Sequence, residues 1–261
     1  MNYSSRVFQH LLIALLLWPI VVLAEVNLTP AEAENIGRKI WQNEGAGKVE
    51  NLAVWNAGED FPSFGIGHFI WYPTGVSGIF EESFPQLLSG LAQERELPVW
   101  LVEGQGAPWR SREEFLAMID DPVLQELRAL LADTVVQQTV FIVARMQAAL
   151  PVMLEALDEP AAQAQVARQF ARVANAPNGL YALIDYVNFK GEGTSPRERY
   201  RGEGWGLLQV LEQMDENSPD VMTEFARAAD FVLTRRVANA DRDESRWLPG
   251  WRKRVATYVS R

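Results

Sequence analysis

Glu44 is the residue whose position in the sequence points most clearly to chemistry. It follows Ile36 and Ile40 by eight and four residues, so it extends the apolar stripe of a predicted helix. It also lies at the C-terminal end of that helix, where the backbone carbonyls disfavour negative charge. Burial and the helix end both favour a protonated carboxyl group, which is what a general acid requires. The alternative is an exposed glutamate that merely ends the helix.

A second group of polar residues follows in a turn. The segment "AGEDFPS" contains Glu59, Asp60 and Ser63. If this turn folds back beside the helix end, a second carboxylate or a hydroxyl would face Glu44. Such a group can stabilise positive charge at a sugar carbon or position a water molecule. Acids in turns are often only turn formers, so each of these residues also has a purely structural interpretation.

The stretch "FPSFGIGHFIWY" raises a different question, because Gly65, Gly67 and His68 interrupt an aromatic, β-branched run. Glycine inside a strand often marks the close approach of another backbone or a ligand. The group that approaches these glycines is therefore either a neighbouring strand or a substrate. Trp55 precedes the stretch and Trp71 lies within it, and both offer faces for sugar stacking or are ordinary core residues.

Residue counts exclude several kinds of catalysis. The chain has no cysteine and two histidines, of which His10 lies in the N-terminal apolar segment. Cys–His catalysis and histidine-rich zinc sites are therefore excluded, and no GxSxG nucleophile motif is present. Carboxylates are the expected agents, with no metal or organic cofactor.

Residues 1–24 are typical of a secretory signal peptide. Arg6 precedes an apolar run of 13 residues, and small residues precede Glu25. The alternative is an uncleaved N-terminal anchor. Absence of cysteine fits the bacterial periplasm or exterior better than a disulfide-stapled secreted fold. Cleavage would remove one arginine and change the net charge from −10 to −11, which disfavours nucleic acid and anionic lipid surfaces as partners. We expect no stable membrane insertion after cleavage.

The pattern of the remaining chain predicts a mainly α (α+β) fold in a single domain, 25–261. A helix begins after Thr29, with Pro30 at its first position and Glu32 completing a capping box, and Gly45 ends it. A strand near 49–56 and a returning strand over 63–72 complete a helix-plus-hairpin lobe, 28–72. Residues 73–112 look irregular, 113–176 look helical with a buried central helix near "VVQQTVFIVA", and 180–261 contain further helices.

These residues carry a resemblance to the phage-type lysozymes. In that family a Glu-Gly ends a helix, an Asp lies in a hairpin, and a Thr stands directly before an "xGxGH" segment. Glu44-Gly45 and "GIGH" match this order, and Ser63 falls at the Thr position. The segments "ALIDYVNFKGEG" and "RWLPGWRKRVATY" resemble the family's C-terminal part. The similarity covers roughly 30–72 and 180–258, whereas 73–179 is longer and does not match.

The resemblance implies a lysozyme-like fold that hydrolyses β-1,4 bonds of peptidoglycan or a related aminosugar polymer. It implies Glu44 as general acid and Ser63 as the group that positions water. The position of the family's Asp falls on Asp60, or else on Glu59 or Asn56. His68 would then brace the hairpin by hydrogen bonding. The remaining positions, namely Trp55, Gly65, Gly67 and Trp71, would lie next to bound sugar.

Three alternatives remain open. Glu192 precedes "GLLQ" at a distance similar to that of the catalytic Glu of soluble lytic transglycosylases, which makes it an alternative acid. The acidic composition also leaves room for a cationic, chitosan-like glycan. A further alternative is a non-catalytic protein of the same fold that binds glycan or a partner protein in the cell envelope.

Overall fold

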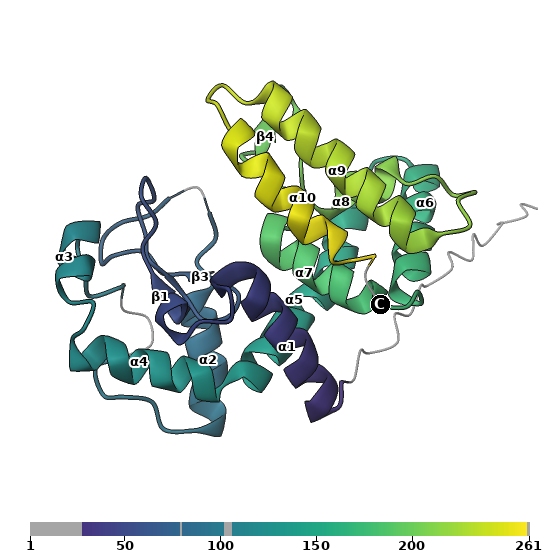
Figure 1. Ribbon diagram of the computed structural model, residues 1–261. Helices are drawn as coiled ribbons and strands as arrows, with labels where there is room; N and C mark the ends of the chain where they lie inside the picture. Colours follow the sequence, from purple (N-terminus) through teal and green to yellow (C-terminus); the bar gives the residue numbers. More distant parts are fainter. Residues whose placement is uncertain (1–27, 79, 102–105, 260–261) are drawn as a thin grey trace, which may run out of the picture.

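The computed structural model describes residues 28–78, 80–101 and 106–259, so the predicted signal peptide lies outside the described residues. The described chain is mainly helical with two small antiparallel sheets, which confirms the predicted fold class. Figure 1 shows two lobes, one holding β1–β3 with α2–α4 and the other holding α6–α10. Helices α1 and α5 lie between them, so residues of both lobes can meet near the end of α1.

Helix α1 spans Pro30–Gly45 and begins as the sequence predicted. The side chain of Thr29 accepts a hydrogen bond from the backbone of Glu32, and the Glu32 carboxylate accepts one from the Thr29 amide. The helix ends because Ala46 adopts a left-handed conformation with φ of 52°. Ile36 and Ile40 are buried, so the predicted apolar stripe faces the core.

The predicted hairpin is a three-stranded meander of very short strands. A 3₁₀ helix, Val49–Leu52, leads into β1, Ala53–Val54, which pairs with β2, Ser63–Phe64, and β2 pairs with β3, Phe69–Ile70. The prediction of one returning strand over 63–72 is therefore wrong. Residues 65–68 form a turn that reverses the chain, and Gly65 (φ 73°) and His68 (φ 48°) both adopt left-handed conformations there.

The groups that approach these glycines are side chains of the protein itself. A Cβ atom at Gly65 would collide with Oε1 of Gln138, which accepts a 2.9 Å hydrogen bond from the amide of Ile66. A Cβ atom at Gly67 would lie 2.8 Å from Oδ1 of Asn188. The two glycines thus let helices α5 and α7 hold the turn by side-chain hydrogen bonds.

Substitution of Gly65 by alanine is expected to destabilise the protein by about 2 kcal/mol or more. The new methyl group would both strain the left-handed backbone and displace Gln138. Chemical denaturation measures this change. Gly90 is a matched control, because it lies inside α2 with open space around its Cα, and Gly90→Ala should stabilise the protein by about 0.5–1 kcal/mol. Equal effects of the two substitutions would contradict the described turn.

The first lobe contains a helix that the sequence did not predict. Residues 73–112 were expected to be irregular, yet Phe84–Glu94 form α2. Helices α3, Arg112–Ala117, and α4, Pro122–Asp133, complete the lobe. Its core is an aromatic cluster of Phe64, Trp71, Phe84, Trp109 and Phe115.

Helix α5, Val135–Glu155, connects the two lobes. It is the one helix of the described residues that is long and apolar enough to cross a bilayer by length and composition. Its packing explains this composition, because it contacts α1, α2, α6 and α7 and buries Ile142, Met146 and Leu150. This placement confirms the predicted central helix.

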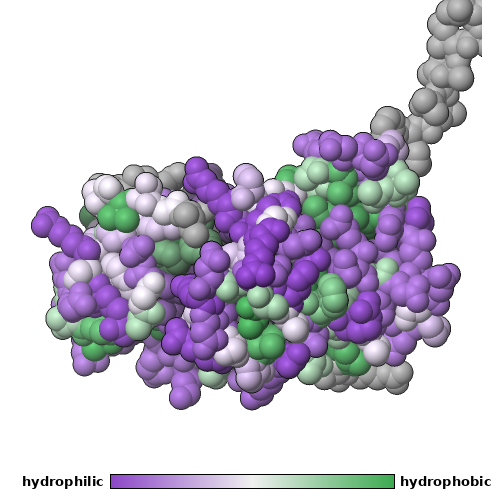
Figure 2. All heavy atoms as spheres, turned by 90° about the horizontal axis from the view of Figure 1, so that it is seen from above, coloured by the Kyte–Doolittle hydropathy of each residue, from purple (hydrophilic) through white to green (hydrophobic). Residues whose placement is uncertain are grey.

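The second lobe is formed by the remaining helices and one small hairpin. Helices α6, Pro160–Ala174, and α7, Gly179–Lys190, are followed by the two short strands β4, Arg199–Tyr200, and β5, Glu203–Gly204. The last elements are α8, Leu207–Gln213, α9, Val221–Asn239, the 3₁₀ helix Ser245–Trp247 and α10, Leu248–Ala256. Seen from above, most of the surface is hydrophilic and the hydrophobic patches are small and separate (Figure 2).

Candidate active site

The carboxyl group of Glu44 lies where α1, α7, α10 and the β2–β3 turn meet. Its Oε1 is 2.7 Å from Nη1 of Arg254 and 3.4 Å from Nδ2 of Asn188, and its Oε2 is 3.7 Å from Nδ1 of His68. Its side chain is 15% exposed, so it remains in contact with solvent while three other elements surround it. The alternative of a glutamate that projects freely from the helix end is therefore wrong.

Arg254 is a partner that the sequence analysis did not assign. The expectation of a neutral Glu44 considered only the helix end and burial, whereas the structure places the guanidinium of Arg254 2.7 Å from the carboxyl group. The segment "RWLPGWRKRVATY" drew attention only through its resemblance. Spacing alone gave no reason to pair its last arginine with α1.

Asp185 fixes the position of Arg254. The arginine donates two hydrogen bonds to the Asp185 carboxylate, at 2.8 and 2.9 Å, in a bidentate arrangement. Tyr258 donates a third at 2.6 Å and Asn43 a fourth at 3.3 Å. Asp185 is completely buried, so α7, α10 and α1 are held together by a polar group that water does not reach. The pKa of Arg254 is raised well above its usual value because the charges of Asp185 and Glu44 outweigh the effect of burial.

Asn188 connects the turn to the acid. Its Nδ2 lies 3.4 Å from Oε1 of Glu44 and donates to the carbonyl of Gly67 at 3.2 Å. His68 does not brace the hairpin by side-chain hydrogen bonding, contrary to the prediction. Its ring faces Glu44, and its Nε2 is buried without a hydrogen-bond partner among the described residues.

Of the two turn acids, Glu59 is the one whose charge interacts with His68. Glu59 is half-buried, and burial raises its pKa, while a hydrogen bond from Asn56 and the charge of His68 act in the opposite direction. Asp60 is exposed and acts at a distance on Tyr72, whose pKa is raised mainly by burial. His68 therefore lies within electrostatic reach of Glu59 and in contact with Glu44, and Glu59 is the better second carboxylate.

The raised pKa of Glu59 predicts a pH-dependent cost to stability. A carboxyl whose pKa is raised in the folded state binds its proton more tightly there, so stability is lost as pH rises from about 4.5 through the folded-state pKa. Glu59→Gln should therefore raise the melting temperature at pH 7 and leave it nearly unchanged at pH 4. Thermal unfolding at both values tests this, and an equal shift at both would exclude ionisation as the cause.

Three predicted site residues lie in the core instead. Ser63 is 4% exposed within β2, and none of the hydrogen bonds among the described residues joins it to Glu44. Trp55 and Trp71 were expected to offer faces to sugar. They are 5% and 2% exposed, because Trp55 packs on Phe115 and Trp71 packs on Phe64. The prediction of sugar stacking at the two tryptophans is therefore wrong. The predicted substrate contact at Gly65 and Gly67 is also wrong, because side chains of the protein occupy the space beside both glycines.

The alternative acid Glu192 lies in a separate arrangement. The carbonyls of Gly191 and Glu192 accept hydrogen bonds from Leu207 and Leu208, so the backbone at Glu192 serves to dock this loop onto α8. Its carboxylate contributes to the raised pKa of half-buried Glu198, for which burial is the main cause. The sequence analysis did not single out Glu198, although this residue lies on the same loop as Glu192.

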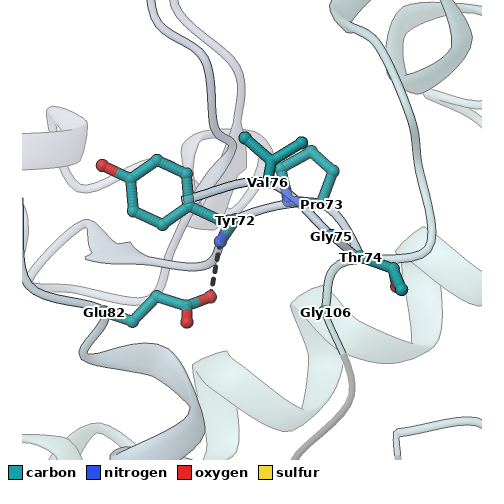
Figure 3. Close-up of a pocket in the computed structure, with 7 residues that line it drawn as sticks. All are labelled: Tyr72, Pro73, Thr74, Gly75, Val76, Glu82 and Gly106. Atoms are coloured by element: carbon teal, nitrogen blue, oxygen red, sulfur yellow. Dashed lines mark hydrogen bonds between the residues drawn. The ribbon is translucent and has the colours of Figure 1, made fainter. Parts of the chain in front are cut away.

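A cavity of about 370 Å³ opens beside the chain that follows β3 (Figure 3). The amide of Tyr72 donates a 2.7 Å hydrogen bond to Glu82 at its edge. The other residues that line it are Pro73, Thr74, Gly75, Val76 and Gly106. Glu44 and its partners are not among the lining residues, so this cavity is distinct from the candidate site.

Within the described parts of the chain, no three side chains of His, Asp or Glu gather as metal ligands. Comparisons with protein families, curated proteins and solved structures found no match for this chain.

Proposed function

We propose that this protein is an exported, lysozyme-like glycoside hydrolase that cleaves β-1,4 bonds of peptidoglycan or a related aminosugar polymer. One observation carries the proposal. The carboxyl of Glu44 is partly buried at the junction of the two lobes, where it is surrounded by Arg254, Asn188 and His68. Carboxyl groups in such partly desolvated, hydrogen-bonded positions are where glycosidases place their acid.

The contacts of Glu44 suit a carboxyl group that must alternate between a protonated and an ionised state. A saccharide bound over the carboxyl would exclude water and favour the protonated acid. After the proton passes to the leaving oxygen, the carboxylate that remains is stabilised by Arg254, which lies 2.7 Å away. Asn188 restricts the orientation of the carboxyl by contacting Oε1. Arg254 keeps its bidentate contact with Asp185 throughout, so it need not move.

Glu59 is proposed as the second carboxylate. Its charge interacts with that of His68, and Nδ1 of His68 lies 3.7 Å from Oε2 of Glu44. A saccharide bound between them would have one carboxyl at its leaving oxygen and one near its anomeric carbon, as glycosidases require. The proposed export, to the periplasm or outside the cell, is supported by residues 1–24, whose sequence is typical of a secretory signal peptide.

The direct test is hydrolysis by the protein without its first 24 residues. New reducing ends should form from purified peptidoglycan or from chitosan, measured over a range of pH. Release of reducing ends supports the proposal. Binding to either polymer without turnover supports a non-catalytic glycan-binding protein of the same fold. The 2.7 Å ion pair between Glu44 and Arg254 favours this second candidate, because it engages the carboxyl in a structural contact.

A further inference from the structure

The cavity beside the chain that follows β3 contains a carboxylate with one free oxygen. Oε1 of Glu82 accepts the hydrogen bond from the amide of Tyr72, and none of the hydrogen bonds among the described residues reaches Oε2 (Figure 3). Pro73 and Val76 line the same cavity with apolar atoms, and none of its described lining residues is a lysine or an arginine. The cavity therefore offers a single anionic acceptor next to an apolar wall.

The other acids near this cavity have no cationic partner within the protein. Asp60, Glu82 and Glu59 all act on the phenol of Tyr72, whose pKa is raised mainly by burial and further by these three charges. None of the ion pairs among the described residues includes Glu59, Asp60, Glu81 or Glu82. An occupant with a positive charge would therefore meet several acids that are not already neutralised.

The first lobe as a whole carries almost all of the net charge. Residues 46–133 contain 14 acidic and 5 basic side chains, whereas residues 134–261 contain 16 of each, and the chain has a net charge of −10. Such an asymmetry steers cations toward one side of a molecule. The field of the lobe therefore acts in the same direction as the acids beside the cavity.

Exposed apolar side chains lie next to the cavity. Val76 is 44% exposed and Phe80 is 41% exposed. Phe80 packs edge-on against Phe61, with ring centroids 5.9 Å apart, and its backbone is hydrogen-bonded to the hydroxyl of Tyr72. An apolar surface around a pocket, with charged groups at its rim, is typical of a protein interface. A small polyamine would leave this apolar surface exposed, whereas a peptide can cover it.

We propose that this cavity binds a lysine side chain of a basic protein partner. The ammonium group would donate to Oε2 of Glu82, and the aliphatic stem would lie along Pro73 and Val76. Lysine fits better than arginine, because a bidentate guanidinium pair needs both carboxylate oxygens and the amide of Tyr72 occupies one of them. This interaction goes beyond the proposed hydrolysis, since Glu44 and its partners do not line the cavity.

Isothermal titration with the capped tripeptide acetyl-Leu-Lys-Leu-amide tests the proposal. Acetylation of the lysine Nζ should weaken binding by about tenfold or more, because it removes the charge. Glu82→Gln should weaken binding of the unmodified tripeptide about tenfold and leave binding of the acetylated form unchanged. Val76→Ser should weaken both forms about threefold, because it removes apolar contact.

Glu96→Gln is the matched control. It removes one negative charge from the same lobe, but Glu96 is exposed and lies beyond the other end of α2. It should change the affinity less than about twofold. Glu82→Gln keeps an acceptor for the amide of Tyr72, so its melting temperature should match that of the unsubstituted protein. Val76→Ser changes an exposed side chain and tests the cavity even if Glu82→Gln fails to fold.

Four outcomes would overturn the proposal. Absence of saturable binding would exclude the site, and equal binding of the acetylated tripeptide would exclude recognition of the ammonium group. Equal weakening by Glu82→Gln and Glu96→Gln would mean that only the overall charge of the lobe matters. Binding of cadaverine or of an amine-bearing muropeptide more tightly than the tripeptide would assign the cavity to a small amine or to the glycan instead of a protein partner. Hydrolysis of glycan is measured separately and can succeed or fail in each case.

Discussion

Replacement of Glu44 by glutamine should reduce hydrolysis by about 10²–10⁴-fold while glycan binding is retained. Glutamine has nearly the shape of glutamate and keeps an oxygen that can accept from Arg254 and Asn188, but it cannot transfer a proton to a leaving oxygen. Initial rates of reducing-end formation at saturating polymer measure the effect. Fold stability should change little, because Arg254 retains both hydrogen bonds to Asp185.

Glu34→Gln provides the control for this substitution. Glu34 lies on the same helix, but its side chain is 49% exposed, and its one ion pair among the described residues is with exposed Arg38. Its removal should alter the rate by less than about twofold, since exposed pairs contribute little. If Glu44→Gln retained more than a tenth of the rate, the acid would have to be another carboxyl, and Glu192 and Glu59 would be substituted next.

Helix α1 could be predicted from the sequence almost completely, because everything that defines it is local. Thr29, Pro30 and Glu32 lie within one turn of each other, and the apolar stripe repeats at helical spacing. The mainly helical fold class could also be predicted from the sequence, because most segments have a clear helical period. Helix α2 was missed because its short sequence lies among prolines and glycines that are typical of loops.

The β2–β3 turn could not be predicted because its causes are distant in the sequence. "SFGIGHF" alternates as a strand does, and strand periodicity was the natural interpretation. What fixes the turn is a hydrogen bond from Ile66 to Gln138, 72 residues away, and one from Asn188, 121 residues from Gly67. Only the tertiary packing of α5 and α7 reveals that the glycines accommodate these side chains.

The position of Glu44 was predictable, but its electrostatic partner was not. A local pattern identifies an acid at a helix end, whereas pairing with Arg254 depends on how α10 packs against α1. One signal for the buried network was present. Asp185 stands in the apolar run "ALIDYV", and a charged residue there is almost never fully buried unless it is paired. That rule indicates a partner without identifying it.

Asp185→Asn is expected to give the largest loss of stability in the protein, about 3–5 kcal/mol. Asp185 is completely buried and accepts hydrogen bonds from Arg254 and Tyr258, so an uncharged side chain would leave the arginine with one nearby acid, Glu44. Asparagine has nearly the same volume, which limits any contribution from a cavity. Urea denaturation gives the free energy of unfolding, and a fall of roughly 10 °C in melting temperature is the corresponding thermal effect.

Two further variants decide whether the loss comes from the buried charge. Asp230→Asn breaks an ion pair with Arg252 whose side chains are 41% and 52% exposed, and it should cost less than about 1 kcal/mol. Combining Asp185→Asn with Arg254→Met removes both charges, so the double variant should be more stable than Asp185→Asn alone. If the double variant were no more stable than Asp185→Asn alone, the loss would not come from an unpaired Arg254, and the inference that Asp185 positions Arg254 against Glu44 would have to be abandoned.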